Sequence, residues 1–395
     1  MTGKNQMHGA AAGEIRLRIA QLQTLMLLHG FDAALLVQRV DVVYFAGTGQ
    51  NAQLFVPAVG EPTLFVRKSL ARAQQDSPLT TVALKNLQEL GSYAQPNQVW
   101  GMELDVLPVT LWERYQKIML GVQIKDISGL IKQLRMVKSD YELEQLHQAG
   151  VIMDKVWRSV PELLQPGISE VALTGKLESV ARSEGSQGFI RMRSFNQEMN
   201  FAHLMSGANA AVPSFFDGPT GGVGLGVAFP HGPSLAPIEP GMPIVFDLTL
   251  AYNGYTVDQT RMGALGKVDS FWQEIYQKSL EIQDLLITHA VPGAVAGDLY
   301  AMVLQRVEAM GLSQNFMGFA PDQAPFVAHG VGLELDELPV LAKGVKTVLQ
   351  TGMVFAAEPK FVFPGRGAVG IENTFQVTQQ GLERITFADE AFLEI

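Results

Sequence analysis

The sequence predicts a two-domain α/β (α+β) protein, and three observations favour this class. The chain has 395 residues, which is long enough for two domains that each have a core. Short apolar runs typical of strands alternate with helical patterns through its first third. Later in the chain, a segment containing a turn and a helix occurs twice, which indicates that one α/β unit has been duplicated.

The first domain is predicted to span residues 1–135. Apolar side chains recur at helical spacing between residues 15 and 28, and a buried-strand run follows from Ala33 to Val37. The apolar runs Leu54–Val56 and Leu64–Val66 flank a Gly-Glu-Pro turn and predict a β-hairpin. The sequence of this domain contains no phosphate-binding loop and no cluster of chemically reactive residues.

The second domain is predicted to span residues 136–395. Ser139, with Glu142 three residues later, has the pattern of a capping box, in which each side chain bonds a backbone N–H at the start of a helix. We therefore expect a long helix to begin here and to continue through Trp157.

The repeat lies in this second domain. QPGISEVALTGKLESVARSEG and VPGAVAGDLYAMVLQRVEAMG align without gaps, with Pro166-Gly167 matching Pro292-Gly293. In each copy a Pro-Gly turn precedes a helix that stops at a glycine, Gly185 or Gly311. A longer helix precedes each turn, and strand-like segments follow. We expect two similar halves with a sheet lined by helices.

Composition excludes several classes of function. The formal net charge of -10 argues against a nucleic-acid partner. The chain has no cysteine, so any metal ion must be held by nitrogen and oxygen ligands. The first residues lack an apolar signal-like run, and no later run approaches membrane length. We expect a cytoplasmic protein with no membrane partner.

Two aspartates flank a predicted β-hairpin whose turn is Asn253-Gly254. With a two-residue turn, Thr249 faces Asp258 across the strands, and Asp247 shares that face. Diagonal neighbours lie roughly 7–8 Å apart, so both carboxylates could converge on metal ions about 3.5–4 Å apart. Aspartate is disfavoured in strands, which favours metal ligands over solvated side chains.

Three further segments supply candidate ligands. Glu358 ends an apolar run, and Glu372 lies inside the strand-like VGIENTFQVT. A buried carboxylate needs a partner, which can be a metal ion or a salt bridge. His329, in HGVG, becomes a candidate because four carboxylates accompany it, and His231, in FPHGPS, is a second candidate. The remaining histidines, including His203, receive no role.

These segments resemble those of the pita-bread metallopeptidases, which include Xaa-Pro aminopeptidases, prolidases, methionine aminopeptidases and their relative creatinase. DLTLAYNGYTVDQTR is similar to the paired-aspartate hairpin of that family, HGVG to its histidine segment, and EP and IENT to its two glutamate segments. The first domain resembles that of the creatinase and prolidase branch. The resemblance implies a creatinase-like α/β domain followed by a pita-bread domain with duplicated ααββ halves.

The resemblance also implies an activity. The chain would be a dinuclear metal-dependent aminopeptidase or dipeptidase of the Xaa-Pro type, which hydrolyses the N-terminal bond of short peptides through a metal-bridging water. Two ions of Mn²⁺, Co²⁺, Fe²⁺ or Zn²⁺ would be held by Asp247, Asp258, His329, Glu358 and Glu372. Glu358 would also act as general base, and His231 would hydrogen-bond the substrate carbonyl or the tetrahedral intermediate. The family resemblance predicts a homodimer.

Two positions depart from the prolidase pattern. Asp336 stands where a second histidine is usual, and Gly370 stands where an arginine is frequent. An ionised carboxylate can only accept hydrogen bonds, so we expect Asp336, a candidate catalytic residue, to bind a cationic or N–H group of the substrate. The departures motivate one alternative, a creatinase-fold hydrolase or lyase acting on a small non-peptide substrate. A further alternative is a non-catalytic binding protein derived from a peptidase.

Overall fold

The computed structural model describes residues 10–395. The chain divides after Arg135 into two compact units, and both contain helices and strands, so the predicted α/β class is confirmed. Within residues 10–395, no helix combines the length and the apolar character that are needed to cross a membrane.

The first unit is built on a six-stranded sheet with the strand order β4-β3-β2-β1-β5-β6. Its strands are β1 (Ala33–Leu36), β2 (Ala52–Pro57), β3 (Thr63–Val66), β4 (Thr80–Ala83), β5 (Val99–Met102) and β6 (Gln123–Asp126). Its helices are α1 (Ala12–Leu28), α2 (Arg39–Ala46), α3 (Leu70–Asp76), the 3-10 helix η1 (Leu87–Tyr93), α4 (Val109–Ile118) and α5 (Ser128–Met136), whose last residue lies past the division. The predicted β2–β3 hairpin is present, and Leu54 pairs with Leu64.

The second unit contains a nine-stranded sheet, whose main path runs β11-β10-β12-β15-β9-β8-β7. Its strands are β7 (Ala202–Ser206), β8 (Ile244–Tyr252), β9 (Tyr255–Ala264), β10 (Phe326–Gly330), β11 (Glu337–Ala342), β12 (Val354–Ala357), β15 (Glu372–Thr378), β16 (Gly381–Arg384) and β17 (Leu393–Glu394). A separate two-stranded sheet pairs β13 (Lys360–Phe363) with β14 (Gly367–Gly370).

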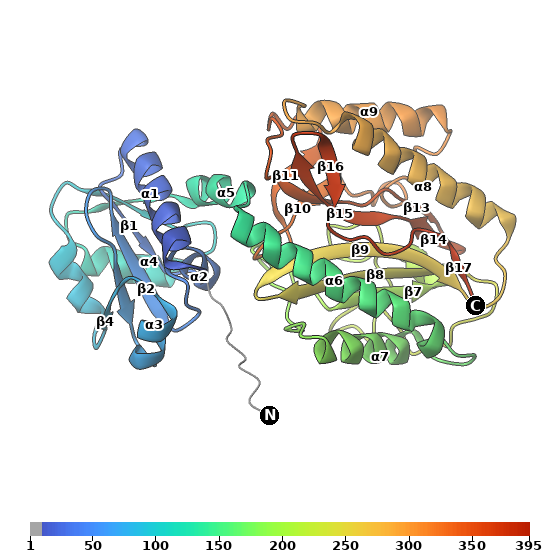
Figure 1. Cartoon of the computed structure of the whole chain (residues 1–395), viewed down its shortest axis with the longest axis horizontal. Helices are drawn as coiled ribbons and strands as arrows, with labels where there is room; N and C mark the ends of the chain where they lie inside the picture. The colour runs from blue at the N-terminus through green and yellow to red at the C-terminus, as the bar shows by residue number, and fades with distance from the viewer. Residues whose placement is uncertain (1–9) are drawn as a thin grey trace. The chain divides into compact units, whose positions relative to one another are not determined.

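Four helices of this unit contact the strands, and Figure 1 shows α6 crossing in front of β8 and β9. These helices are α6 (Asp140–Leu163), α7 (Glu170–Ser183), α8 (Ser270–His289) and α9 (Ala296–Ala309), and a short 3-10 helix, η2 (Gly207–Ala211), follows β7. The capping box forms as predicted, because Ser139 and Glu142 each accept a backbone N–H at the start of α6. This helix continues beyond Trp157 to Leu163.

The duplication has a structural counterpart. Helices α6 and α7 precede β7, β8 and β9, and helices α8 and α9 precede the strands from β10 onward. The matched turn glycines Gly167 and Gly293 have φ of 80° and 95°, and the matched stop glycines Gly185 and Gly311 have φ of 106° and 72°. Glycine tolerates positive φ at no steric cost, so the same backbone device recurs at the same points of both copies.

The β8–β9 hairpin has the predicted register. Tyr252 pairs with Tyr255, and Thr249 pairs with Asp258. Asn253 and Gly254 form the turn with φ of 48° and 89°. Two positive φ values are what a type I′ turn requires, and they match the right-handed twist of the strands. The hairpin therefore fixes which face carries each aspartate.

Candidate metal centre

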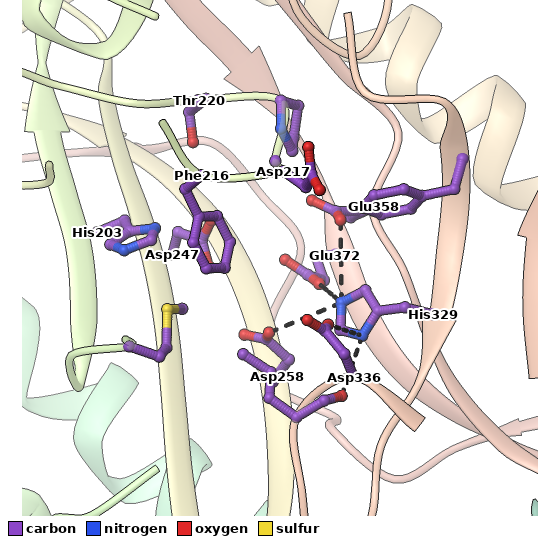
Figure 2. Close-up of a pocket in the computed structure, with 15 residues that line it drawn as sticks. His203, Phe216, Asp217, Thr220, Asp247, Asp258, His329, Asp336, Glu358 and Glu372 are labelled. Atoms are coloured by element: carbon purple, nitrogen blue, oxygen red, sulfur yellow. Dashed lines mark hydrogen bonds and ion pairs between the residues drawn. The ribbon is translucent and has the colours of Figure 1, made fainter. Parts of the chain in front are cut away.

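Five neighbouring strands of the nine-stranded sheet bring the predicted ligands together. His329 lies on β10, Glu358 follows the last residue of β12, Glu372 begins β15, and the aspartates lie on β9 and β8. Thr260 of β9 stands opposite both Asp247 and Glu372, which places these carboxylates in one row across the sheet. Figure 2 shows the acidic side chains and His329 directed toward one another from these strands.

His329 is oriented by its own backbone surroundings. Its Nδ1 lies 3.2 Å from the carbonyl oxygen of Leu335 and 3.3 Å from that of Gly330. A carbonyl can only accept, so Nδ1 carries the proton and Nε2 is the atom presented to the carboxylates. A backbone carbonyl bonded to the far nitrogen is the usual support for a metal-ligating histidine.

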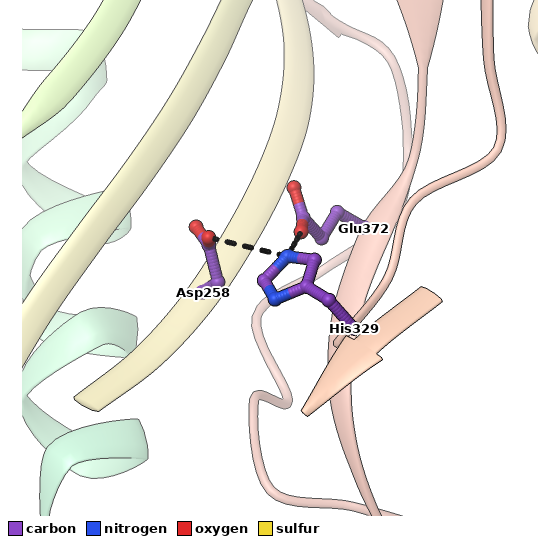
Figure 3. A group of neighbouring side chains, drawn as sticks. All are labelled: Asp258, His329 and Glu372. Atoms are coloured by element: carbon purple, nitrogen blue, oxygen red, sulfur yellow. Dashed lines mark ion pairs between the residues drawn. The ribbon is translucent and has the colours of Figure 1, made fainter. Parts of the chain in front are cut away.

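Three carboxylate oxygens surround His329 Nε2 (Figures 2 and 3). Glu372 Oε1 lies at 3.7 Å, Glu358 Oε1 at 3.8 Å and Asp258 Oδ2 at 4.0 Å. Asp258, His329 and Glu372 form a buried group whose donor atoms all lie within 4.8 Å of one another. The donors converge from separate strands, so a small central cation could contact all of them.

The second oxygens of these carboxylates are occupied by protein. Asp258 Oδ1 accepts the hydroxyl of Thr249 and the backbone N–H of Gln259. Glu372 Oε2 accepts the hydroxyl of Thr260. In contrast, Glu372 Oε1 is buried and has no hydrogen-bond partner in the described part of the chain. An unpaired buried carboxylate oxygen is costly, so the residues present fit a divalent metal ion at this point.

The electrostatics of the cluster also indicate a cation. Burial raises the pKa of Glu358 to about 7 and that of Asp247 to about 6, against the opposing charge of Lys360. Burial and the charges of Glu372 and Asp247 hold the pKa of Asp258 well above its ordinary value. Four neighbouring buried carboxylates therefore cannot all remain charged without positive charge beside them.

Part of that positive charge comes from Lys360, which belongs to none of the sequence motifs. Lys360 is buried, and its Nζ donates to Glu358 Oε2 at 2.7 Å, Glu372 Oε2 at 2.9 Å and Asp247 Oδ2 at 3.0 Å. Burial alone would lower the pKa of Lys360, but the three carboxylates raise it well above its ordinary value. A lysine in the apolar strand KFVF, two residues after a candidate ligand, is the sequence signal that could have revealed it.

His329 responds to the same charges. Burial opposes its charged form, but interaction with Glu372 and the charges of Asp336 and Glu358 raise its pKa well above the ordinary value. For Glu372 the balance is reversed: burial disfavours its charge, and Lys360 and His329 lower its pKa to about 2. Glu372 is therefore the carboxylate that the surroundings hold most firmly as an anion.

Two further histidines lie beside the cluster. His203, on β7, lines the cavity at the centre, whereas His231 is not among the lining residues. The rings of His203 and His231 are in contact, with centroids 3.9 Å apart. Burial lowers the pKa of His231 to about 4 and holds that of His203 well below its ordinary value, so both rings are neutral. His203 had no motif and received no role from the sequence.

The cavity is small and partly covered. Its volume is about 30 Å³, which is room for about two water molecules. Its walls include the segment Phe216–Thr220, and Figure 2 places Phe216 in front of Asp247. Asp336 also lines it, with Oδ1 3.6 Å from His329 Nδ1 and 42% of its side chain exposed. Asp336 therefore faces the cavity from its solvent side.

Comparisons with known proteins identify the family of this chain. The sequence profile of metallopeptidase family M24 matches residues 144–379, and that of the creatinase/prolidase N-terminal domain matches residues 18–137. The chain belongs to metallopeptidase family M24. This M24 chain is 28% identical over 379 residues to the Xaa-Pro dipeptidase of Pyrococcus furiosus, an alignment that covers 95% of this chain and 99% of that relative.

Solved structures show the same similarity. The prolidase from Pyrococcus furiosus has a TM-score of 0.79 at 27% identity, covering 93% of this M24 chain and 99% of the other. The prolidase from Pyrococcus horikoshii has a TM-score of 0.81 at 25% identity, covering 95% and 99%. The predicted family, the creatinase-like and pita-bread architecture and the hydrolase class are confirmed. The non-peptide alternative gains no support from these relatives.

Proposed function

We propose that this M24 chain is a metal-dependent peptidase that cleaves the N-terminal bond of short peptides with proline in the second position. The observation that carries the proposal is Glu372 Oε1, a buried oxygen with no partner among the described residues that lies 3.7 Å from His329 Nε2. The named relatives are Xaa-Pro dipeptidases and prolidases, which supports the substrate class.

The metal would be held by Asp258, His329, Glu358 and Glu372. A bound divalent ion lowers the pKa of a water molecule and polarises a carbonyl. The oxygen-rich set with one imidazole suits Mn²⁺ first, and Fe²⁺, Co²⁺ or Zn²⁺ next. The resemblance also predicts a second ion bound through Asp247. Lys360 contacts Asp247 and therefore affects the number of ions that the site can bind. Residues 136–395 would form the catalytic domain, and residues 1–135 the creatinase-like domain.

Side chains of the protein would act as general base, as hydrogen-bond donor to the carbonyl and as acceptor for the amino terminus. Glu358 would take the proton of the attacking water, because one of its oxygens faces the metal-binding donors. One of two neutral rings in contact would donate to the scissile carbonyl: His203, which lines the cavity, or His231, which packs against His203. Asp336 would bind the amino terminus of the peptide from the solvent side of the cavity.

Metal-reconstituted activity tests the proposal. Purified protein is stripped with chelator, reloaded with Mn²⁺, and assayed on matched peptides that carry proline or alanine in the second position. We expect turnover only with metal, and at least tenfold higher kcat/KM for the proline series. Asp258→Asn, which keeps the shape but weakens a ligand, should lose most activity, and His231→Ala should lose about 10²–10³-fold if it serves the oxyanion.

Each part of the proposed function would be contradicted by a different result. Equal rates for wild type and Asp258→Asn would remove the metal centre from the mechanism. Hydrolysis of small amides with no turnover of any peptide would favour the non-peptide alternative, and stoichiometric metal with no turnover at all would favour a binding protein. Unchanged kcat/KM in His231→Ala would end its proposed role.

We also propose a homodimer and a cytoplasmic location, both on the family resemblance. Analytical ultracentrifugation of the full chain would test the first, because a monomer at micromolar concentration contradicts it. Cell fractionation would test the second, because recovery of the protein outside the cytoplasm contradicts it.

A further inference from the structure

The ammonium of Lys360 is surrounded as a metal ion would be. It lies 2.7–3.0 Å from one oxygen each of Glu358, Glu372 and Asp247. An ammonium has three protons, so these three acceptors use its whole donor capacity. All four side chains are buried, so solvent screens these charges little.

The carboxylate oxygens divide into two sets around two points. Glu358 and Glu372 turn Oε2 to the ammonium, together with Asp247 Oδ2. The same two glutamates turn Oε1 toward His329 Nε2, together with Asp258 Oδ2. Two bridging carboxylates between two cation positions are what a dinuclear site requires, and here the protein itself supplies the cation at one of them.

Gly370 provides the room for this arrangement. Lys360 and Gly370 are register partners across the β13–β14 pair. A Cβ added at Gly370 would lie 2.3 Å from Lys360 Cγ and 2.8 Å from its Cα. A side chain at position 370 would therefore collide with residue 360, so Gly370 leaves the room in which Lys360 stands. Both are positioned by backbone, which makes the arrangement a built feature of the site.

We propose that Lys360 takes the place of the second metal ion, so that the site binds one divalent ion, held by Asp258, His329, Glu358 and Glu372. This inference rests on the proposed metal-dependent function. Asp247 is then a positioning residue for the lysine and not a metal ligand. A second ion would have to displace an ammonium that makes three charge-assisted hydrogen bonds, and the displaced charge would need another buried partner.

Metal stoichiometry tests the inference without reference to activity. The full chain is saturated with Mn²⁺, freed of excess ion, and analysed by elemental mass spectrometry and by titration calorimetry. We expect one ion per chain. Two ions per chain would overturn the inference and leave the metal-dependent function standing. No bound ion, with Asp258→Asn behaving as wild type, would overturn the inference and the proposed function together.

Three variants locate the ion. Asp247→Asn should bind one ion, the same number as wild type. In a dinuclear site the same substitution would lower the number of bound ions from two to one. Asp258→Asn should bind none. Lys360→Ala, which removes the ammonium and opens space, should bind two; retention of one ion there would show that the lysine is not what excludes the second. If Lys360→Ala does not fold, anomalous diffraction from wild-type crystals decides the question, because a single Mn²⁺ peak beside His329 supports the inference and a second peak at the Asp247 side overturns it.

Discussion

At the scale of single residues, Asp336 places a carboxylate where the resemblance predicts a second histidine. It lines the cavity, and its carboxylate lies 3.6 Å from His329 Nδ1. An acceptor at the solvent side of the cavity is suited to the ammonium of a peptide amino terminus. A hydrogen bond to a charged group contributes roughly 1.5–3 kcal/mol, so its loss should be visible in KM.

We predict that Asp336→Asn raises KM for Xaa-Pro dipeptides by about tenfold, the equivalent of about 1.4 kcal/mol. The contact itself is tested by comparing the inhibition constants of dipeptide analogues that carry a free or an acetylated amino group. Wild type should prefer the free amine, and the variant should lose that preference. Asp298→Asn, at an exposed position on α9, is the matched control, and metal content is measured in both because Asp336 neighbours His329. An unchanged preference would show that the carboxylate does not contact the amino terminus.

The residue scale is also where the sequence was least informative. The candidate ligands could be found because each sits in a short local pattern, such as the Asn-Gly hairpin or HGVG. Lys360 and His203 sit in no such pattern, and they reach the site only through β13–β14 and β7–β8 pairing. Strand pairing between distant segments is not encoded by local periodicity, so the charge balance of the site could not be read from the sequence.

At the scale of elements, the β13–β14 pair determines whether the lysine can occupy the centre. We predict that Gly370→Ala destabilises the protein by several kcal/mol, because the new Cβ would lie 2.3 Å from Lys360 Cγ and neither strand can move freely. Overpacking costs typically about 1–3 kcal/mol, and loss of the lysine's hydrogen bonds adds to it. The measurement is the midpoint of chemical denaturation in chelator.

Gly175→Ala provides the matched control for that variant. Gly175 lies within α7, and nothing lies within 4 Å of an added Cβ there. Alanine in a helix interior is favoured over glycine by roughly 0.5–1 kcal/mol, so this variant should equal or exceed the wild type. A Gly370→Ala protein as stable as Gly175→Ala would show that Lys360 is not packed against β14 as described.

The elements differ in how far they could be predicted. The β8–β9 hairpin and the start of α6 were predicted with their registers, since an Asn-Gly turn and a capping box are local chemistry. The segment Phe216–Thr220, which lines the cavity, carries no such local signal. Its sequence, FDGPT, has no periodicity, and its place at the cavity follows from the contacts of Phe216 with the rings of His203 and His231.

At the scale of the whole molecule, the metal centre should couple folding to pH. The carboxyls Asp247 and Glu358 have pKa values raised by burial to about 6 and about 7 in the folded chain, from ordinary values of 3.8 and 4.5. A carboxyl with a raised folded pKa binds its proton more tightly in the folded state. The contribution of such a carboxyl to the free energy of unfolding is therefore largest at acid pH, and it is lost as the pH rises through the folded pKa. Glu372, with a pKa lowered to about 2 by Lys360 and His329, acts in the opposite sense and only below its ordinary value of 4.5.

We therefore predict that metal-free protein loses stability as pH rises from about 5 to about 7.5, and that Mn²⁺ restores it. The metal-induced rise in Tm should grow over the same interval, because bound metal requires deprotonated carboxylates. At an ion concentration about 100-fold above Kd, binding contributes about 2.7 kcal/mol. Calorimetry of wild type and Asp258→Asn, with and without Mn²⁺, measures this directly. If the metal-induced Tm shift is independent of pH, or is equal in Asp258→Asn, the titrating carboxylates do not belong to the metal centre.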